Sequence, residues 1–144
     1  IAMRDGTRLA TDVYLPDRPG RIPAVLARTP YGKRGNPVWF GAIGRLFAEH
    51  GMAFVVQDTR GQHDSEGIAE PFTPEASDGY DTCEWIVAQP WSDGTLGVFG
   101  ESFVGYAALA AAASGHSSIR AAALRNTIDR PSRVKLTGRI TGEP

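Results

Sequence analysis

The chain has 144 residues, of which 42% are hydrophobic and 22% are charged, and its formal net charge is −1. This length and composition are typical of one globular domain with its own hydrophobic core. The near-neutral charge gives no electrostatic reason to expect nucleic acid or a membrane as a partner. A single cysteine, Cys83, excludes an internal disulfide framework and a CxxC metal site, and we expect a buried core thiol there.

The apolar runs are short. The longest, YAALAAAA, is too short to span a bilayer. The first residues lack the basic start and apolar stretch of a signal peptide, so we expect a cytoplasmic protein. The chain opens on Ile1 and not on Met, which indicates a piece of something longer.

The first part of the chain predicts a hairpin, a strand and a helix. Residues 1–15 are typical of a β-hairpin, because Asp5 and Gly6 form a dipeptide that tight hairpin turns prefer. The apolar run at 22–29 ends before a proline and predicts a buried strand. Helically spaced apolar residues and a closing glycine predict a helix over 39–51.

Strands and helices alternate through the rest of the chain. The further predicted strands cover 52–58, 95–100 and 119–127, and the further predicted helices cover 75–89 and 103–115. A polar loop, residues 59–74, separates two of these elements. This order predicts an α/β fold, with a mostly parallel sheet flanked by helices on both faces after an opening hairpin.

Ser102 stands where a predicted strand passes into an alanine-rich helix. In a nucleophile elbow the chain turns sharply at this point and holds a serine hydroxyl exposed beside a helix N-terminus. The general elbow pattern is G-x-S-x-G, but here Val104 stands where the second glycine is expected and Gly105 follows it. The alternative role for Ser102 is capping of the helix.

Four segments in order resemble the cocaine esterase / X-prolyl dipeptidyl-peptidase family of serine hydrolases, which includes α-amino-acid ester hydrolases. The segments are MRDGTRLATDVYLP (3–16), RTPYGK (28–33), QDTRGQHDSEG (57–67) and GESFVG (100–105). The family's elbow is G-x-S-[YF]-x-G, so the late glycine is its ordinary form. The resemblance implies that residues 1–128 are the N-terminal half of an α/β-hydrolase catalytic domain. Residues 129–144 would then lead towards a helical cap.

The resemblance also implies roles for individual residues. Ser102 corresponds to the nucleophile that is acylated, and the Phe103 backbone N–H and the Tyr31 hydroxyl correspond to the oxyanion hole. His63 lies in a family-like loop and is expected to line the substrate pocket rather than act as the base. Without the resemblance, Tyr31 is an ordinary turn aromatic after a proline. No metal or organic cofactor is implied.

The catalytic acid and base are missing from the sequence pattern. In this fold the triad order is Ser, then Asp or Glu, then His. His116 follows a helix about 20 Å long that leads away from the serine, and His50 is expected at the opposite edge of the sheet. Asp129 is expected to be a loop residue at the cap entry, while Asp58 and Arg60 are expected to fix their loop.

Two hypotheses of function follow. In the first, the chain is part of a serine hydrolase that cleaves an ester or an Xaa-Pro/amino-acyl bond through an acyl-enzyme on Ser102. Its partners would be a small ester or short peptide and the remainder of the hydrolase, from the same gene or a second chain. The chain alone would be inactive. In the second, it is a degenerate, non-catalytic half that serves as a binding or assembly module.

Overall fold

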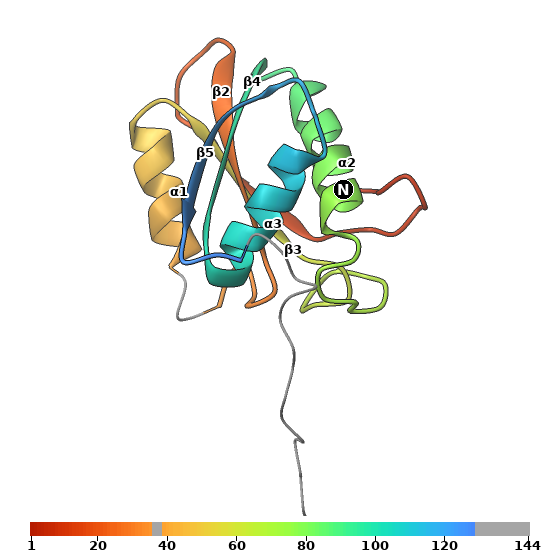
Figure 1. The fold of residues 1–144 in the computed structure, drawn as a ribbon. Coiled ribbons are helices and arrows are strands. Elements are labelled where there is room, and N and C mark those ends of the chain that lie inside the picture. The colour runs from red at the N-terminus through yellow and green to blue at the C-terminus, as the bar shows by residue number, and fades with distance from the viewer. Residues whose placement is uncertain (36–38, 129–144) are drawn as a thin grey trace, which may run out of the picture.

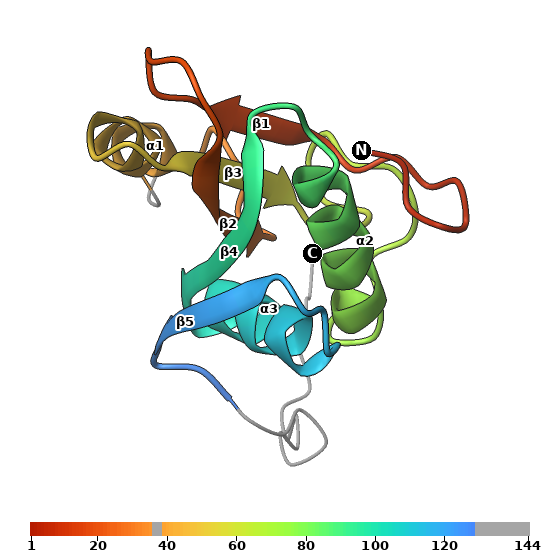
Figure 2. The same cartoon turned by 90° about the horizontal axis from the view of Figure 1, so that it is seen from above.

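A computed structural model describes residues 1–35 and 39–128. The strands are Thr11–Tyr14 (β1), Ile22–Thr29 (β2), Ala53–Asp58 (β3), Ser92–Glu101 (β4) and Ile119–Arg125 (β5). The helices are Phe40–Glu49 (α1), Glu75–Val87 (α2) and Ser102–Ala113 (α3). Five strands form one sheet in the order β1-β3-β2-β4-β5, with α1 on one face and α2 and α3 on the other (Figures 1 and 2).

The sheet is parallel apart from its first strand. β2 pairs in parallel with β3 and β4, and β4 pairs in parallel with β5, whereas β1 runs antiparallel to β3. The prediction of an α/β fold with a mostly parallel sheet is therefore confirmed. The carboxyl ends of β2, β3 and β4 meet at one edge of the sheet, which is where ligands bind in open α/β sheets.

The opening hairpin is short. Its arms are joined by one antiparallel bridge, between Ala2 and Arg8, and the bend includes Gly6 with a φ of +85°. The rest of the expected second arm pairs instead with β3, where Thr11 lies opposite Gln57. β3 is a buried strand along its whole length, so it offers β1 a well-shielded hydrogen-bonding partner.

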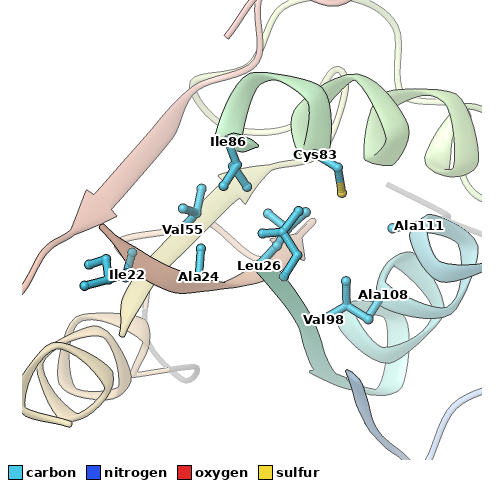
Figure 3. Close-up of a cluster of buried hydrophobic side chains, with 11 residues drawn as sticks. Ile22, Ala24, Leu26, Val55, Cys83, Ile86, Val98, Ala108 and Ala111 are labelled. Carbon is cyan, nitrogen blue, oxygen red and sulfur yellow. The ribbon is translucent and has the colours of Figure 1, made fainter. Parts of the chain in front are cut away.

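Two hydrophobic clusters hold the helices to the sheet. The larger one joins Leu26, Val55 and Val98 of the sheet to side chains of α2 and α3 (Figure 3). The smaller one lies under α1. As expected, Cys83 is fully buried in the larger cluster, and burial raises the pKa of its thiol to about 12. Cys83 is therefore a protonated core residue at neutral pH.

α2 and α3 cross closely at Gly79. A Cβ atom at this position would lie 2.7 Å from the Cβ of Ala111, so no larger residue fits without a shift of the helices. Glycine is a poor helix former, and its place inside α2 is explained by this contact. Ala108 and Ala111 of α3 are both buried in the larger cluster.

The helix boundaries differ from the prediction in small ways. α3 begins at Ser102 itself, one residue earlier than predicted. Leu46 of α1 and His50, the C-cap residue that follows it, are exposed, although both lie on the expected helical spacing. Among the helices of residues 1–35 and 39–128, none combines the length and apolarity that crossing a membrane requires. The expected connection at 129–144 lies outside the described residues.

Candidate active site

Ser102 is held in an unusual backbone conformation at the turn from β4 to α3. Its φ is +56°, whereas Glu101 before it is extended, with φ −122° and ψ 149°. A left-handed conformation costs a non-glycine residue on the order of 1–3 kcal/mol. Glu101 occupies the N-cap position, and no side chain makes a capping hydrogen bond there. Ser102 is therefore not the capping serine of this helix.

The two glycines around Ser102 make the sharp turn possible. A Cβ at Gly100 would collide with the backbone carbonyl of Val104 in the first turn of α3. A Cβ at Gly105 would lie 3.0 Å from both the Gly100 carbonyl oxygen and the Cβ of Thr127. Val104, by contrast, is buried in the cluster under α1. This packing explains why the second glycine comes one position later than in the general pattern.

Tyr31 lies near Ser102, because both side chains line the same two hollows. The aromatic hollow, of about 240 Å³, is lined by Tyr31, Phe72, Ser102, Phe103, Tyr106, Asn126 and Ile128. The core-side hollow, of about 270 Å³, is lined by Tyr31, Phe40, Ile43, Phe99, Gly100, Glu101, Ser102 and Val104. β2 and β4 are parallel neighbours, so residues that follow β2 and β4 reach the same edge.

A larger hollow, of about 400 Å³, lies at the start of α1 between Tyr14 and Arg45. Neither Ser102 nor any other serine or cysteine lines it. A hollow of about 450 Å³ beside His50 is larger still, and it too is lined by no serine or cysteine. The presence of a nucleophile, and not volume, therefore distinguishes the two hollows beside Ser102. We therefore take the two hollows beside Ser102 as the candidate active site.

An aromatic wall forms one side of the aromatic hollow. The ring centroid of Phe72 lies 5.1 Å from that of Phe103 and 4.9 Å from that of Tyr106. The Tyr106 hydroxyl donates a hydrogen bond of 3.1 Å to the Phe72 carbonyl oxygen. Burial, and secondarily the charge of Glu75, raises the pKa of Tyr106, so this hydroxyl stays protonated at neutral pH.

Sequence reasoning missed two members of this wall, Phe72 and Tyr106. Tyr106 stands three residues after Phe103, and this helical spacing alone places their side chains on one face. Phe72 has no such signal, because it comes from the loop before α2 and reaches the site only through the tertiary fold. Its backbone φ of +72° also departs from what a phenylalanine normally adopts.

Buried charges fix the loop that follows β3. Both carboxylate oxygens of Asp58 accept hydrogen bonds from Lys33. Arg60 donates two hydrogen bonds, of 3.0 and 2.7 Å, to the carboxylate of Asp78 and one of 2.7 Å to Asp5. The expectation that Asp58 and Arg60 serve to hold their loop is confirmed by these contacts.

His63 contacts the turn that carries Tyr31. Its Nε2 is 3.1 Å from the Pro30 carbonyl oxygen, and its ring packs against Gly32. It lines neither hollow beside Ser102. Its expected part in substrate binding stays a prediction.

The other two histidines lie away from Ser102, as expected. His116, beyond the far end of α3, has Nδ1 at 2.7 Å from the Ser118 hydroxyl. Its Nε2 lies 2.9 Å from a Glu84 carboxylate oxygen, in an alignment that makes no hydrogen bond. The Nδ1 of His50 is 2.8 Å from the Leu46 carbonyl oxygen at the end of α1. Asp129 lies outside the described residues.

A mostly parallel sheet, covered by helices on both faces and with a serine at a strained strand-to-helix turn, places the chain in the α/β-hydrolase class. The model of the X-Pro dipeptidyl-peptidase (S15) family matches residues 5–133. The chain belongs to this family of hydrolases.

Known proteins of the same kind match most of the chain. Cocaine esterase from Rhodococcus sp. (strain MB1 Bresler) is 42% identical over 125 residues, which cover 85% of this chain and 22% of the esterase. An aminopeptidase from marine sediment archaeon Thaumarchaeota archaeon has a TM-score of 0.75 and 29% identity, covering 85% of this chain and 23% of that one. An α-amino acid ester hydrolase has a TM-score of 0.72 and 32% identity, with coverages of 85% and 23%. This chain thus spans less than a quarter of the length of these relatives.

Proposed function

We propose that this chain carries the nucleophile of a serine hydrolase that cleaves an ester or an Xaa-Pro/amino-acyl bond. The observation that supports the proposal best is the strained turn of Ser102 beside two hollows that it shares with Tyr31. Strain of this kind is kept in proteins where the surrounding structure enforces it, and it gathers at active sites. Here glycine contacts on both sides of the turn enforce it.

The proposed reaction has two halves. The Ser102 hydroxyl oxygen attacks the substrate carbonyl carbon while a histidine from outside this chain takes the hydroxyl proton. The tetrahedral intermediate collapses, the bond to the leaving alcohol or amine breaks, and the histidine returns the proton to that group. Water then attacks the acyl-enzyme in the same manner and releases the acid and free Ser102.

The oxyanion is held by two donors from different elements. Phe103 is the second residue of α3, so its N–H has no partner within the helix and is available to a developing negative charge. The Tyr31 hydroxyl approaches from the turn after β2, and the Tyr31 side chain is 42% exposed. A helix N-terminus adds a favourable dipole at the same place.

The acid and the base come from the remainder of the hydrolase, in the same or a second chain. The three histidines of this chain are placed elsewhere, as their contacts with Pro30, Leu46 and Ser118 indicate. β5 ends the described sheet and exposes Ala121, Ala122 and Ala123. An uncovered edge strand of this kind invites pairing with a further strand, and we propose that the remainder docks there.

The lining of the aromatic hollow favours an uncharged acyl group, whereas Glu101 lines the core-side hollow. The aromatic hollow is lined by rings and by Asn126, with no carboxylate among its lining residues. The residue after Tyr31 is Gly32, which offers no acidic anchor for a substrate ammonium group. An ester is therefore favoured over a peptide with a free amino terminus.

Covalent labelling tests the role of Ser102. A fluorophosphonate probe should label the enzyme in which this chain is joined to the segment that supplies the histidine. Labelling should disappear in Ser102→Ala, and it should persist in Ser117→Ala, which changes an exposed serine beyond the far end of α3. Unchanged labelling of Ser102→Ala would refute the proposal and would favour the non-catalytic alternative.

A further inference from the structure

Tyr31 sits in a tight turn whose position depends on a small set of specific contacts. The turn follows β2, and its backbone is closed by a 3.0 Å hydrogen bond from the Gly35 N–H to the Gly32 carbonyl oxygen. The Tyr31 N–H donates to the Thr29 hydroxyl at 3.0 Å. Because the Tyr31 ring is half-exposed, its packing alone cannot set where the hydroxyl points. The position of the hydroxyl therefore depends on how the turn is anchored.

The anchor is a buried ion pair between Lys33 and Asp58. The Lys33 backbone N–H donates to Asp58 Oδ1 at 2.6 Å, and its Nζ donates to Asp58 Oδ2 at 3.1 Å. The Lys33 side chain is 4% exposed and that of Asp58 is 1% exposed. Asp64, which is largely exposed, accepts a further 2.6 Å hydrogen bond from Lys33 Nζ. Such charge-assisted hydrogen bonds are the strong ones in proteins.

The position of Asp58 is itself fixed by the sheet. It is the last residue of β3 and lies opposite Thr29 in the parallel pairing of β2 with β3. The hydrogen bond from the Thr59 N–H to the Thr29 carbonyl oxygen, 2.9 Å long, extends this pairing past the strand ends. Lys33 donates hydrogen bonds to the Asp58 carboxylate from both its backbone N–H and its side-chain Nζ. The turn therefore cannot rotate on the sheet without breaking both bonds.

We propose that Lys33, held by Asp58, is a positioning residue that sets the place of the Tyr31 hydroxyl. The inference rests on the proposed oxyanion role of Tyr31. An oxyanion donor is effective only within a narrow range of distance from the developing charge. Loss of the anchor therefore lowers the rate of the chemical step and leaves substrate binding almost unchanged.

The first test compares three variants of the enzyme in which this chain is joined to the segment that supplies the histidine. Lys33→Met and Asp58→Asn each loosen the anchor. Each should lower kcat about 10- to 100-fold, less than the loss of a whole oxyanion donor, with KM within about threefold of the parent. Arg34→Met is the matched control, because Arg34 lies in the same turn but is 73% exposed and pairs with Asp12. Its kcat should stay within about twofold of the parent.

A double-mutant cycle then separates positioning from general support of the fold. If Lys33 acts through the Tyr31 hydroxyl, adding Lys33→Met to Tyr31→Phe should lower kcat by less than about twofold more. Additive losses would overturn the inference. Circular dichroism checks that each variant is folded, and Asp58→Asn takes the place of Lys33→Met in the cycle if the latter does not fold.

The outcomes also separate this inference from the proposed function. If Tyr31→Phe keeps the parental kcat, the oxyanion role of Tyr31 is wrong and the positioning role falls with it. If Tyr31→Phe loses about 10²- to 10³-fold while Lys33→Met and Asp58→Asn keep full activity, only the positioning role is wrong.

Discussion

The backbone conformation of Ser102 lowers the stability of the fold, although its side chain is small. A positive φ suits glycine, which has no Cβ to clash, and is unfavourable for serine and alanine alike. The turn is therefore maintained against its own local preference by the packing of Gly100 and Gly105. Strained residues cluster at functional sites, and in this chain Phe72 and Asn126, which also have a positive φ, line the same hollow as Ser102.

This strain predicts the effect of two substitutions on stability. Ser102→Gly should raise the free energy of unfolding by about 1 kcal/mol relative to Ser102→Ala, because only glycine relieves the positive φ. Urea denaturation of the two variants measures the difference. A glycine variant that is less stable than the alanine variant would show that the turn is not strained.

Asp5 provides a second prediction at the scale of one residue. The hydrogen bond from Arg60 holds the pKa of its carboxyl at about 2, well below the usual value. A lowered pKa means that the unfolded chain binds the proton more tightly than the native one. The contribution of Asp5 to stability is therefore present above about pH 4 and is lost as pH falls towards 2.

A carbon-detected NMR titration measures the pKa of Asp5 directly. It should lie near 2 in the parent and return towards the usual range for aspartate, near 4, in Arg60→Gln. A value already near 4 in the parent would mean that the Arg60 contact is absent in solution.

At the scale of helices and strands, sequence patterns predicted some boundaries correctly and others not. β2 matches its predicted bounds, Ile22–Thr29, because an apolar run closed by a proline marks both the strand and its end. β4 begins at Ser92, earlier than predicted, because its first residues are polar and carry no strand pattern. Ser92 pairs with Ile22 of β2, and the register shifts before Leu96 pairs with Ala24. The approach of Tyr31 to Ser102 was predictable because parallel strands end at one edge, whereas the place of Phe72 depends on a loop.

The crossing of α2 and α3 gives a prediction about Gly79. Gly79→Ala improves helix propensity by about 1 kcal/mol but forces a Cβ to within 2.7 Å of the Ala111 Cβ. Overpacking costs about 1–3 kcal/mol, so the variant should be less stable than the parent by about 1 kcal/mol.

The control for this prediction is Gly41→Ala in α1. The nearest atom to a Cβ at Gly41 is the Tyr14 hydroxyl oxygen at 3.5 Å, so the added methyl group fits. This variant should gain up to about 0.5 kcal/mol. Urea denaturation compares both with the parent, and a stabilised Gly79→Ala would contradict the close crossing.

For the whole molecule, the separation of Ser102 from any base decides activity. A serine hydroxyl without an adjacent base is a weak nucleophile at neutral pH. The 144-residue chain alone should therefore hydrolyse a short-chain aryl ester no faster than its Ser102→Ala variant. Spectrophotometric release of the phenolate measures both. Turnover by the chain that is lost in Ser102→Ala would show that the chain holds its own base.

The strand order of the sheet also determines what happens while the chain is being synthesised. β2 lies at the centre of the sheet, yet β4, its neighbour on one side, ends about 70 residues later in the chain. At 5–20 residues per second, a ribosome needs on the order of ten seconds to supply that neighbour. The apolar β2 is first unpaired and then paired on one side only, by β3, and the larger hydrophobic cluster stays incomplete until β4 and α3 have been made. Until then the nascent chain exposes apolar surface that makes it prone to aggregation.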